Sequence, residues 1–110
     1  MKLPHGEKAT IDSRKILDYS VSPEHDDGKH KAKLFETVLG LTRDHASLLI
    51  DALKEAAVDG EAVPGRLDRY GQRYVMDFEF VGPTGQTTLR SAWIIRPGET
   101  TPRLVTCYIL

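Results

Sequence analysis

Hydrophobic and polar residues alternate along residues 70–110, and this alternation predicts three antiparallel strands. Every second residue is apolar or aromatic over 74–80, and a second run rich in apolar residues covers 89–95, as is typical of strands with one buried face. Gly82-Pro83-Thr84-Gly85 between these runs has the sequence of a tight turn, and two prolines mark a longer turn over 96–103. The pattern therefore predicts a β-meander whose last strand follows the second turn.

Upstream of the meander, apolar residues recur at helical spacing instead. Ala32, Phe35 and Leu39 are separated by three and four positions, and Gly40 follows them as a left-handed glycine follows many helices. A second helix is predicted between an N-cap at Thr42 and the pair Asp59-Gly60, with a stripe formed by Ala46, Leu49, Ile50, Leu53 and Ala57.

A shorter helix or turn is predicted after Asp12, an N-cap residue followed by Ile16, Leu17 and Tyr19. Residues 61–69 contain a proline and a glycine, so they predict either one short edge strand or a loop. The fold class is therefore α+β, with two or three N-terminal helices packed on one face of a C-terminal antiparallel meander of three to four strands.

At 110 residues the chain is predicted to be one domain, with an N-terminal arm over 1–10, a helical part over 12–58 and the β-meander over 70–110. Pairing Val81 with Gln86 across the tight turn divides the strands into two faces. The face predicted to meet the helices carries Tyr74, Met76, Phe78, Phe80, Leu89, Trp93, Ile95, Val105, Cys107 and Ile109, with Trp93 opposite Cys107.

Composition narrows the function classes. Fifteen basic and sixteen acidic side chains give a formal net charge of −1, which argues against a protein that holds nucleic acid by bulk charge alone. A single cysteine, Cys107, excludes an intramolecular disulfide, and its apolar surroundings predict a buried thiol. The chain has neither a signal-like apolar run nor a segment of membrane-spanning length. We expect a cytoplasmic protein, the alternative being secretion as a module of a larger toxin polypeptide.

The opposite face of the meander carries the first candidate site. In the predicted register Asp77 lies opposite Arg90, and Thr106 and Tyr108 lie on the neighbouring strand. An arginine fork oriented by a carboxylate, with hydroxyl donors beside it, can bind a phosphate. The alternative is a solvated face with one weak cross-strand ion pair.

The second candidate site is the run Lys29-His30-Lys31 in the first turns of the predicted helix that contains Phe35. Cations at a helix N-terminus oppose the helix dipole, so a functional reason for them is anion binding, with His30 able to transfer a proton near neutral pH. The alternative is again a solvated polar face. The nearby histidines and aspartates have no recognised metal spacing, so we expect no metal and no cofactor.

Four stretches of the chain resemble a family of small bacterial proteins known as a domain of unknown function: Leu3-Pro4-His5-Gly6-Glu7-Lys8-Ala9, Gly28-Lys29-His30-Lys31-Ala32, Tyr70-Gly71-Gln72-Arg73-Tyr74 and Arg103-Leu104-Val105-Thr106-Cys107-Tyr108. The resemblance covers nearly the whole chain. Some members of the family look like C-terminal effector modules of larger toxins, and others are freestanding.

A weaker likeness is to the metal-independent ribonucleases that include barnase, EndoU enzymes, colicin nucleases and RelE-type toxins. Their terminal strand often reads Val-Thr-Ala-Tyr, which is similar to Val105-Thr106-Cys107-Tyr108 here, although this chain has cysteine in place of alanine. The likeness implies an RNA-cleaving toxin-like domain whose residues match at His30, Lys31, Arg90, Thr106 and Tyr108.

The leading hypothesis is therefore RNA cleavage that leaves a 2′,3′-cyclic phosphate. His30 would act as general acid or base, Lys31 and Arg90 would stabilise the charge on phosphorus, and Thr106 and Tyr108 would position the phosphate with help from Asp77 and Lys29. The alternatives are a non-catalytic partner, such as an antitoxin or immunity protein in a two-gene system, and a purely structural protein. The sequence leaves the oligomeric state open.

Overall fold

The computed structural model describes residues 1–16 and 26–110, apart from the side chains of 15 and 26–32. Its elements are η1 (Gly6–Lys8), α1 (Ser13–Lys15), α2 (Asp26–Leu39), η3 (Arg43–His45), α3 (Ala46–Asp59), β1 (Ala62–Asp68), β2 (Gly71–Val81), β3 (Gln86–Ile95) and β4 (Arg103–Ile109). The part of the short predicted helix at Leu17 and Tyr19 lies outside the described residues.

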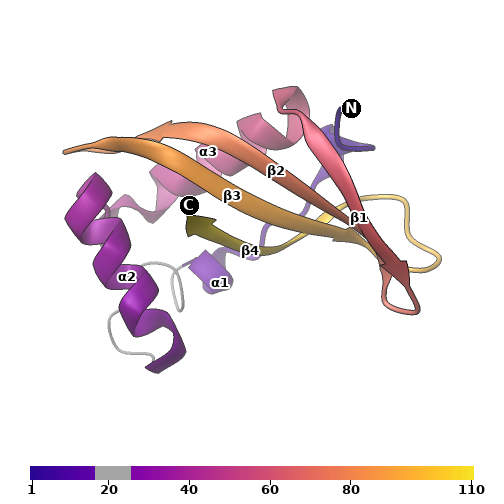
Figure 1. The fold of residues 1–110 in the computed structure, drawn as a ribbon, viewed down its shortest axis with the longest axis horizontal. Helices are drawn as coiled ribbons and strands as arrows, with labels where there is room; N and C mark the ends of the chain where they lie inside the picture. The colour runs from indigo at the N-terminus through magenta and orange to yellow at the C-terminus, as the bar shows by residue number, and fades with distance from the viewer. Residues whose placement is uncertain (17–25) are drawn as a thin grey trace.

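The strands form one four-stranded antiparallel sheet in the order β1-β2-β3-β4 (Figure 1). The stretch that could have been strand or loop is therefore an edge strand, and its register with β2 shifts between Pro64 and Leu67. Edge strands tolerate proline because one row of their backbone groups has no partner strand. The α+β class with a C-terminal antiparallel sheet is confirmed.

Among the described residues, the helical layer contains two long helices, the lower of the two numbers predicted. Within the described ranges only α2 and α3 exceed one turn, while α1 and the two 3-10 segments are single turns. In Figure 1, α3 runs behind the sheet and α2 lies near the end where β2 and β3 join. Among the described residues, no helix has the length and apolar character needed to span a membrane.

The predicted register between β2 and β3 is confirmed over its whole length, from Val81 opposite Gln86 to Tyr74 opposite Trp93. The predicted register between β3 and β4, in which Trp93 lies opposite Cys107, is wrong by two residues. Ser91 pairs with Cys107, but Trp93 pairs with Leu104.

Val105 is the extra residue of a β-bulge in β4, and a bulge changes which residues face the core. Leu104 and Cys107 are both buried, although strict alternation would place them on opposite faces. Val105 was predicted on the core face and is only half-buried, because the bulge gives that place to Leu104. Alternation resumes beyond the bulge, so Thr106 and Tyr108 keep their predicted face.

The core lies between the helices and the inner face of the sheet. Phe35 and Leu39 of α2 and Leu49 and Leu53 of α3 are fully buried, so both predicted helical stripes face the core. Trp93 is the largest fully buried side chain, and its indole N–H donates to the Ser91 hydroxyl over 2.9 Å.

The hairpin between β2 and β3 is fixed to the end of α2. Gly40 has a φ of 70° and ends the helix as predicted, and its N–H donates to the Glu36 carbonyl over 2.9 Å, which is the bond of an αL C-terminal motif. The Thr84 N–H of the hairpin donates to the Leu39 carbonyl over 3.1 Å. The end of the helix thus sets where the hairpin lies.

The N-terminal segment is tied to both edges of the sheet. Lys2 forms a bridge with Glu61 just before β1, and Thr10 forms a parallel bridge with Arg103 of β4. The Thr10 N–H donates to the Pro102 carbonyl, and the Leu104 N–H donates to the Thr10 carbonyl. Residues 10–12 therefore lie beside the first residues of β4.

Candidate functional site

Asp77, Arg90 and Tyr108 lie in one row across the outer face of the sheet. Asp77 of β2 pairs with Arg90 of β3, and Arg90 pairs with Tyr108 of β4. The carboxylate of Asp77 and the phenol of Tyr108 are exposed and Arg90 is half-buried, so this row remains open to solvent. The structure therefore brings these three predicted site residues together.

The carboxylate of Asp77 fixes the guanidinium of Arg90 through two hydrogen bonds. Arg90 Nε donates to Oδ1 over 2.8 Å, and Nη2 donates to Oδ2 over 2.9 Å. The hydrogen bond to Asp77 and the neighbouring Tyr108 raise the pKa of Arg90, and the same hydrogen bond lowers the pKa of Asp77. A bidentate pair holds the fork in one plane and leaves other N–H groups of the guanidinium for a ligand.

Thr106, the fourth predicted member, lies one row away from this row. It pairs with Ala92 of β3, which in turn pairs with Val75 of β2. Towards the β1 edge, a shallow hollow of about 360 Å³ is lined by Glu61, Val63, Val75, Asp77 and Arg90. Arg90 therefore borders a concave surface as well as the hydroxyl groups of β4.

The other predicted residues cannot be placed with the same detail. Lys29, His30 and Lys31 lie in the first turns of α2, but their side chains lie outside the described residues. A site that combines His30 with Arg90 stays a prediction. Within the described part of the chain, no group of three or more His, Cys, Asp and Glu side chains could hold a metal ion.

A larger concave site, which the sequence reasoning missed, lies further along the same sheet. It encloses about 580 Å³, and four arginines line it: Arg69, Arg73, Arg96 and Arg103. We call it the arginine pocket. Its wall also contains Tyr70, and Asp12 is the one acidic residue among its described lining residues.

The arginine pocket lies on the face that carries Arg90. Arg73 and Arg103 are the strand partners of Ile94, two rows beyond the pair of Asp77 and Arg90. Ile94 lies on this outer face of the sheet, yet it is only 8% exposed. Its position between two arginines explains this burial, because the long stems of arginine side chains cover apolar surface.

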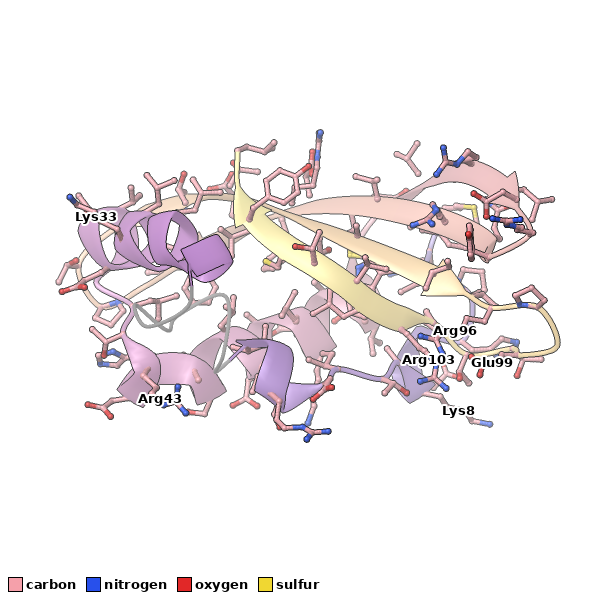
Figure 2. The ribbon with its side chains drawn as sticks, turned by 90° about the horizontal axis from the view of Figure 1, so that it is seen from below. Lys8, Lys33, Arg43, Arg96, Glu99 and Arg103 are labelled. Carbon is pink, nitrogen blue, oxygen red and sulfur yellow. The ribbon has the colours of Figure 1, made fainter. Side chains whose placement is uncertain are left out.

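Two of the four guanidiniums lie next to acidic side chains, and one of these two is held by hydrogen bonds. Arg103 donates to Glu99 from Nε and Nη2, both over 3.0 Å, and Figure 2 shows this pair with Arg96 at one end of the sheet. Arg73 Nε lies 4.0 Å from Asp68 Oδ2, and this buried atom makes no hydrogen bond within the described ranges. One signal in the sequence points to the pocket: Arg69 and Arg96 lie at the two turns on one side of the sheet, and Arg73 and Arg103 lie near the start of the strands that follow these turns.

The pair of Asp77 and Arg90 predicts an acid-sensitive contribution to stability. Folding lowers the pKa of Asp77 below its ordinary value of 3.8, so the pair stabilises the folded protein above that pH and loses this effect as the pH falls through the folded value. We expect Asp77→Asn to make the urea midpoint less dependent on pH below about pH 4. Equal pH slopes for the wild type and the variant between about pH 4 and about pH 2 would contradict this prediction.

A solved structure of another protein has this architecture of a helical layer on a four-stranded antiparallel sheet. A solved structure described as a contact-dependent growth inhibition toxin–immunity protein complex from Klebsiella pneumoniae 342 contains a chain with a similar fold. The TM-score is 0.62 at 18% sequence identity, and the match covers 94% of this chain and 95% of that one. At this identity the match shows the fold alone.

The family of this chain is identified by a match between its sequence and a family model. The model of the family described as "Domain of unknown function (DUF6883)" matches residues 2–110, so the chain belongs to this family. The resemblance to a domain of unknown function, predicted from the four sequence stretches, is confirmed. A search of curated proteins finds no match.

Proposed function

We propose that the chain is the RNA-cleaving component of a bacterial toxin–immunity system. The observation that carries this proposal is the open row in which Asp77 orients Arg90 beside the hydroxyl of Tyr108. An exposed arginine held by a carboxylate next to hydroxyl donors suits an anionic group that gains charge during a reaction. The fold shared with a chain of a toxin–immunity complex supports the biological setting.

The chemistry follows from the requirements of RNA cleavage through the ribose. The 2′-hydroxyl attacks the adjacent phosphorus and loses its proton to a base, the bond to the 5′-oxygen breaks, and that oxygen takes up a proton. The products are a 2′,3′-cyclic phosphate and a 5′-hydroxyl. In the proposal His30 carries these protons, while Arg90 and Lys31 stabilise the negative charge on the phosphorane.

Tyr108 and Thr106 would position the phosphate from the neighbouring strand, and Asp77 would keep the guanidinium in place. Lys29 would contact the substrate from the start of α2. All charge stabilisation is assigned to side chains, so cleavage is expected to proceed without a metal ion.

The test is incubation of the purified protein with total RNA or tRNA in excess chelator. We expect cleavage by the wild type, products with cyclic phosphate ends, and little cleavage by the double variant His30→Ala and Arg90→Ala. A wild-type protein that leaves RNA intact would contradict the proposal. Equal cleavage by the double variant would also contradict it, since a contaminating nuclease would explain the activity.

One observation favours a second candidate, a non-catalytic immunity or antitoxin protein. The edge strand β1 carries exposed apolar side chains, with Val63 64% and Leu67 71% exposed. Partners often add a strand to such an edge. Expression in bacteria separates the two candidates, because a toxin domain slows growth on its own, whereas an immunity protein has no effect until its cognate toxin is present.

A further inference from the structure

We propose that the arginine pocket is a second phosphate-binding subsite, which holds single-stranded RNA next to the row of Asp77, Arg90 and Tyr108. This inference deepens the proposed function and rests on it. The subsite would bind the strand but take no part in the bond-breaking step.

The position of the pocket fits one continuous RNA strand. Ile94, between Arg73 and Arg103, follows Arg90 by four residues along β3, which corresponds to about 13 Å at the rise of a β-strand. A stacked nucleic-acid strand advances about 3.4 Å per nucleotide, so this separation covers up to about four nucleotides. A strand whose phosphate lies at Arg90 therefore reaches the pocket within a few residues.

Guanidinium groups of the arginine pocket are available to bind a phosphate. The charged lining residues are four arginines and Asp12, whose Oδ1 already accepts the Arg14 N–H over 3.0 Å. Glu99 holds Arg103 through two hydrogen bonds, and Asp68 lies 4.0 Å from Arg73 Nε. Among the described residues, Arg69 and Arg96 have no ion pair within 4.0 Å, although Arg96 attracts Glu99 electrostatically.

An aromatic side chain completes the pocket. Tyr70 is 55% exposed, and the Arg69 guanidinium carbon lies 4.9 Å from the centre of its ring. Arg69 Nη2 also donates to the Tyr70 hydroxyl over 2.8 Å, which keeps the two side chains together. Bases of single-stranded RNA stack on aromatic rings and on arginine planes.

The choice of RNA over an acidic protein rests on shape and lining. The site is a concave volume with apolar lining from Ile94, Pro97 and Leu104, and a base can fill such a space while its phosphates meet the arginines. Carboxylates of a partner protein would use the charges but leave the apolar lining and the exposed Tyr70 ring unfilled. Binding of an acidic protein is therefore the competing outcome of the test.

The experiment measures binding without cleavage. A fluorescent 2′-O-methyl RNA octamer lacks the attacking hydroxyl, and its affinity for the full chain is followed by anisotropy between about 50 and 200 mM salt. The test variant is Arg69→Gln with Arg96→Gln, since both residues are exposed and lie at turns. The control is Arg43→Gln with Lys54→Gln, which removes the same charge from exposed positions outside the pocket lining.

We expect the test variant to bind at least about tenfold more weakly at low salt, with a salt slope reduced by about 1.4, since each lost contact to a single strand removes about 0.7. The control variant should lose less than about half of that slope. Urea midpoints close to the wild-type value would show that both variants are folded.

Three results would overturn the inference: wild-type protein that does not bind the octamer, equal losses in the test and control variants, or displacement of the octamer by polyglutamate at equal charge concentration. The last result would assign the pocket to an acidic protein. If the octamer binds as expected but RNA is not cleaved, the proposed function is wrong and the subsite stands. If RNA is cleaved but the test variant binds the octamer as tightly as the wild type, the subsite is wrong and the proposed function stands.

Discussion

Trp93→Ala is expected to cost roughly 3–5 kcal/mol of unfolding free energy, the typical range for removing a buried aromatic side chain. Trp93 is 0% exposed at the centre of the sheet, and every atom removed leaves a void between β3 and the helices. Domains of this size have total stabilities of about 5–15 kcal/mol, so a large fraction of the variant would be unfolded under mild denaturing conditions. Urea titration followed by far-UV circular dichroism measures this effect.

The control is Trp93→Phe, which keeps most of the ring but removes the indole N–H that donates to Ser91. The Ser91 hydroxyl would still donate to the Met76 carbonyl over 3.0 Å, so no buried hydroxyl loses its acceptor. We expect a clearly smaller loss for phenylalanine than for alanine. An alanine variant within about 1 kcal/mol of the wild type would mean that Trp93 is not a central core residue.

Arg90→Gln is expected to lower the rate of RNA cleavage by about 10²- to 10³-fold, the usual cost of removing a donor that stabilises transition-state charge. The variant keeps a polar side chain on β3 and removes the guanidinium fork that Asp77 orients. Single-turnover cleavage of a labelled RNA measures the chemical step separately from binding.

The matched control is Arg66→Gln on β1. The Arg66 side chain is 72% exposed and is the ion-pair partner of Asp68, away from the row that contains Arg90. It should cleave RNA within about threefold of the wild-type rate. A normal rate for Arg90→Gln, or an equal loss for Arg66→Gln, would count against a specific role for Arg90.

Local sequence signals were sufficient for the strands and for most of the helical part. The turn residues around Pro83 fix the hairpin, and alternation then gives the whole register of β2 and β3, including Asp77 opposite Arg90. Gly40 marks the end of α2 because the backbone there has the left-handed conformation, which glycine adopts most readily. Each of these features depends on neighbours that are close in the chain.

The missed features depend on residues that meet only in three dimensions. The bulge at Val105 has no turn residue to mark it, and strict alternation therefore placed Val105 instead of Leu104 on the core face. The long turn over 96–103 does not fix the register of β4, so Cys107 was placed opposite Trp93 instead of Ser91. The arginine pocket combines Arg69 and Arg96 from two turns with Thr10 from the N-terminal segment. The two turns mark one end of the sheet, but no pattern in the sequence places Thr10 beside them.

The bridge between Thr10 and Arg103 has a consequence for the order of folding. It joins residues about 90 positions apart, and closing so long a loop costs more chain entropy than forming either hairpin. Contacts of this range are expected to form after the local strand pairs. The wall that Thr10 and Asp12 contribute to the arginine pocket would thus be added late, to a sheet whose strands have already paired.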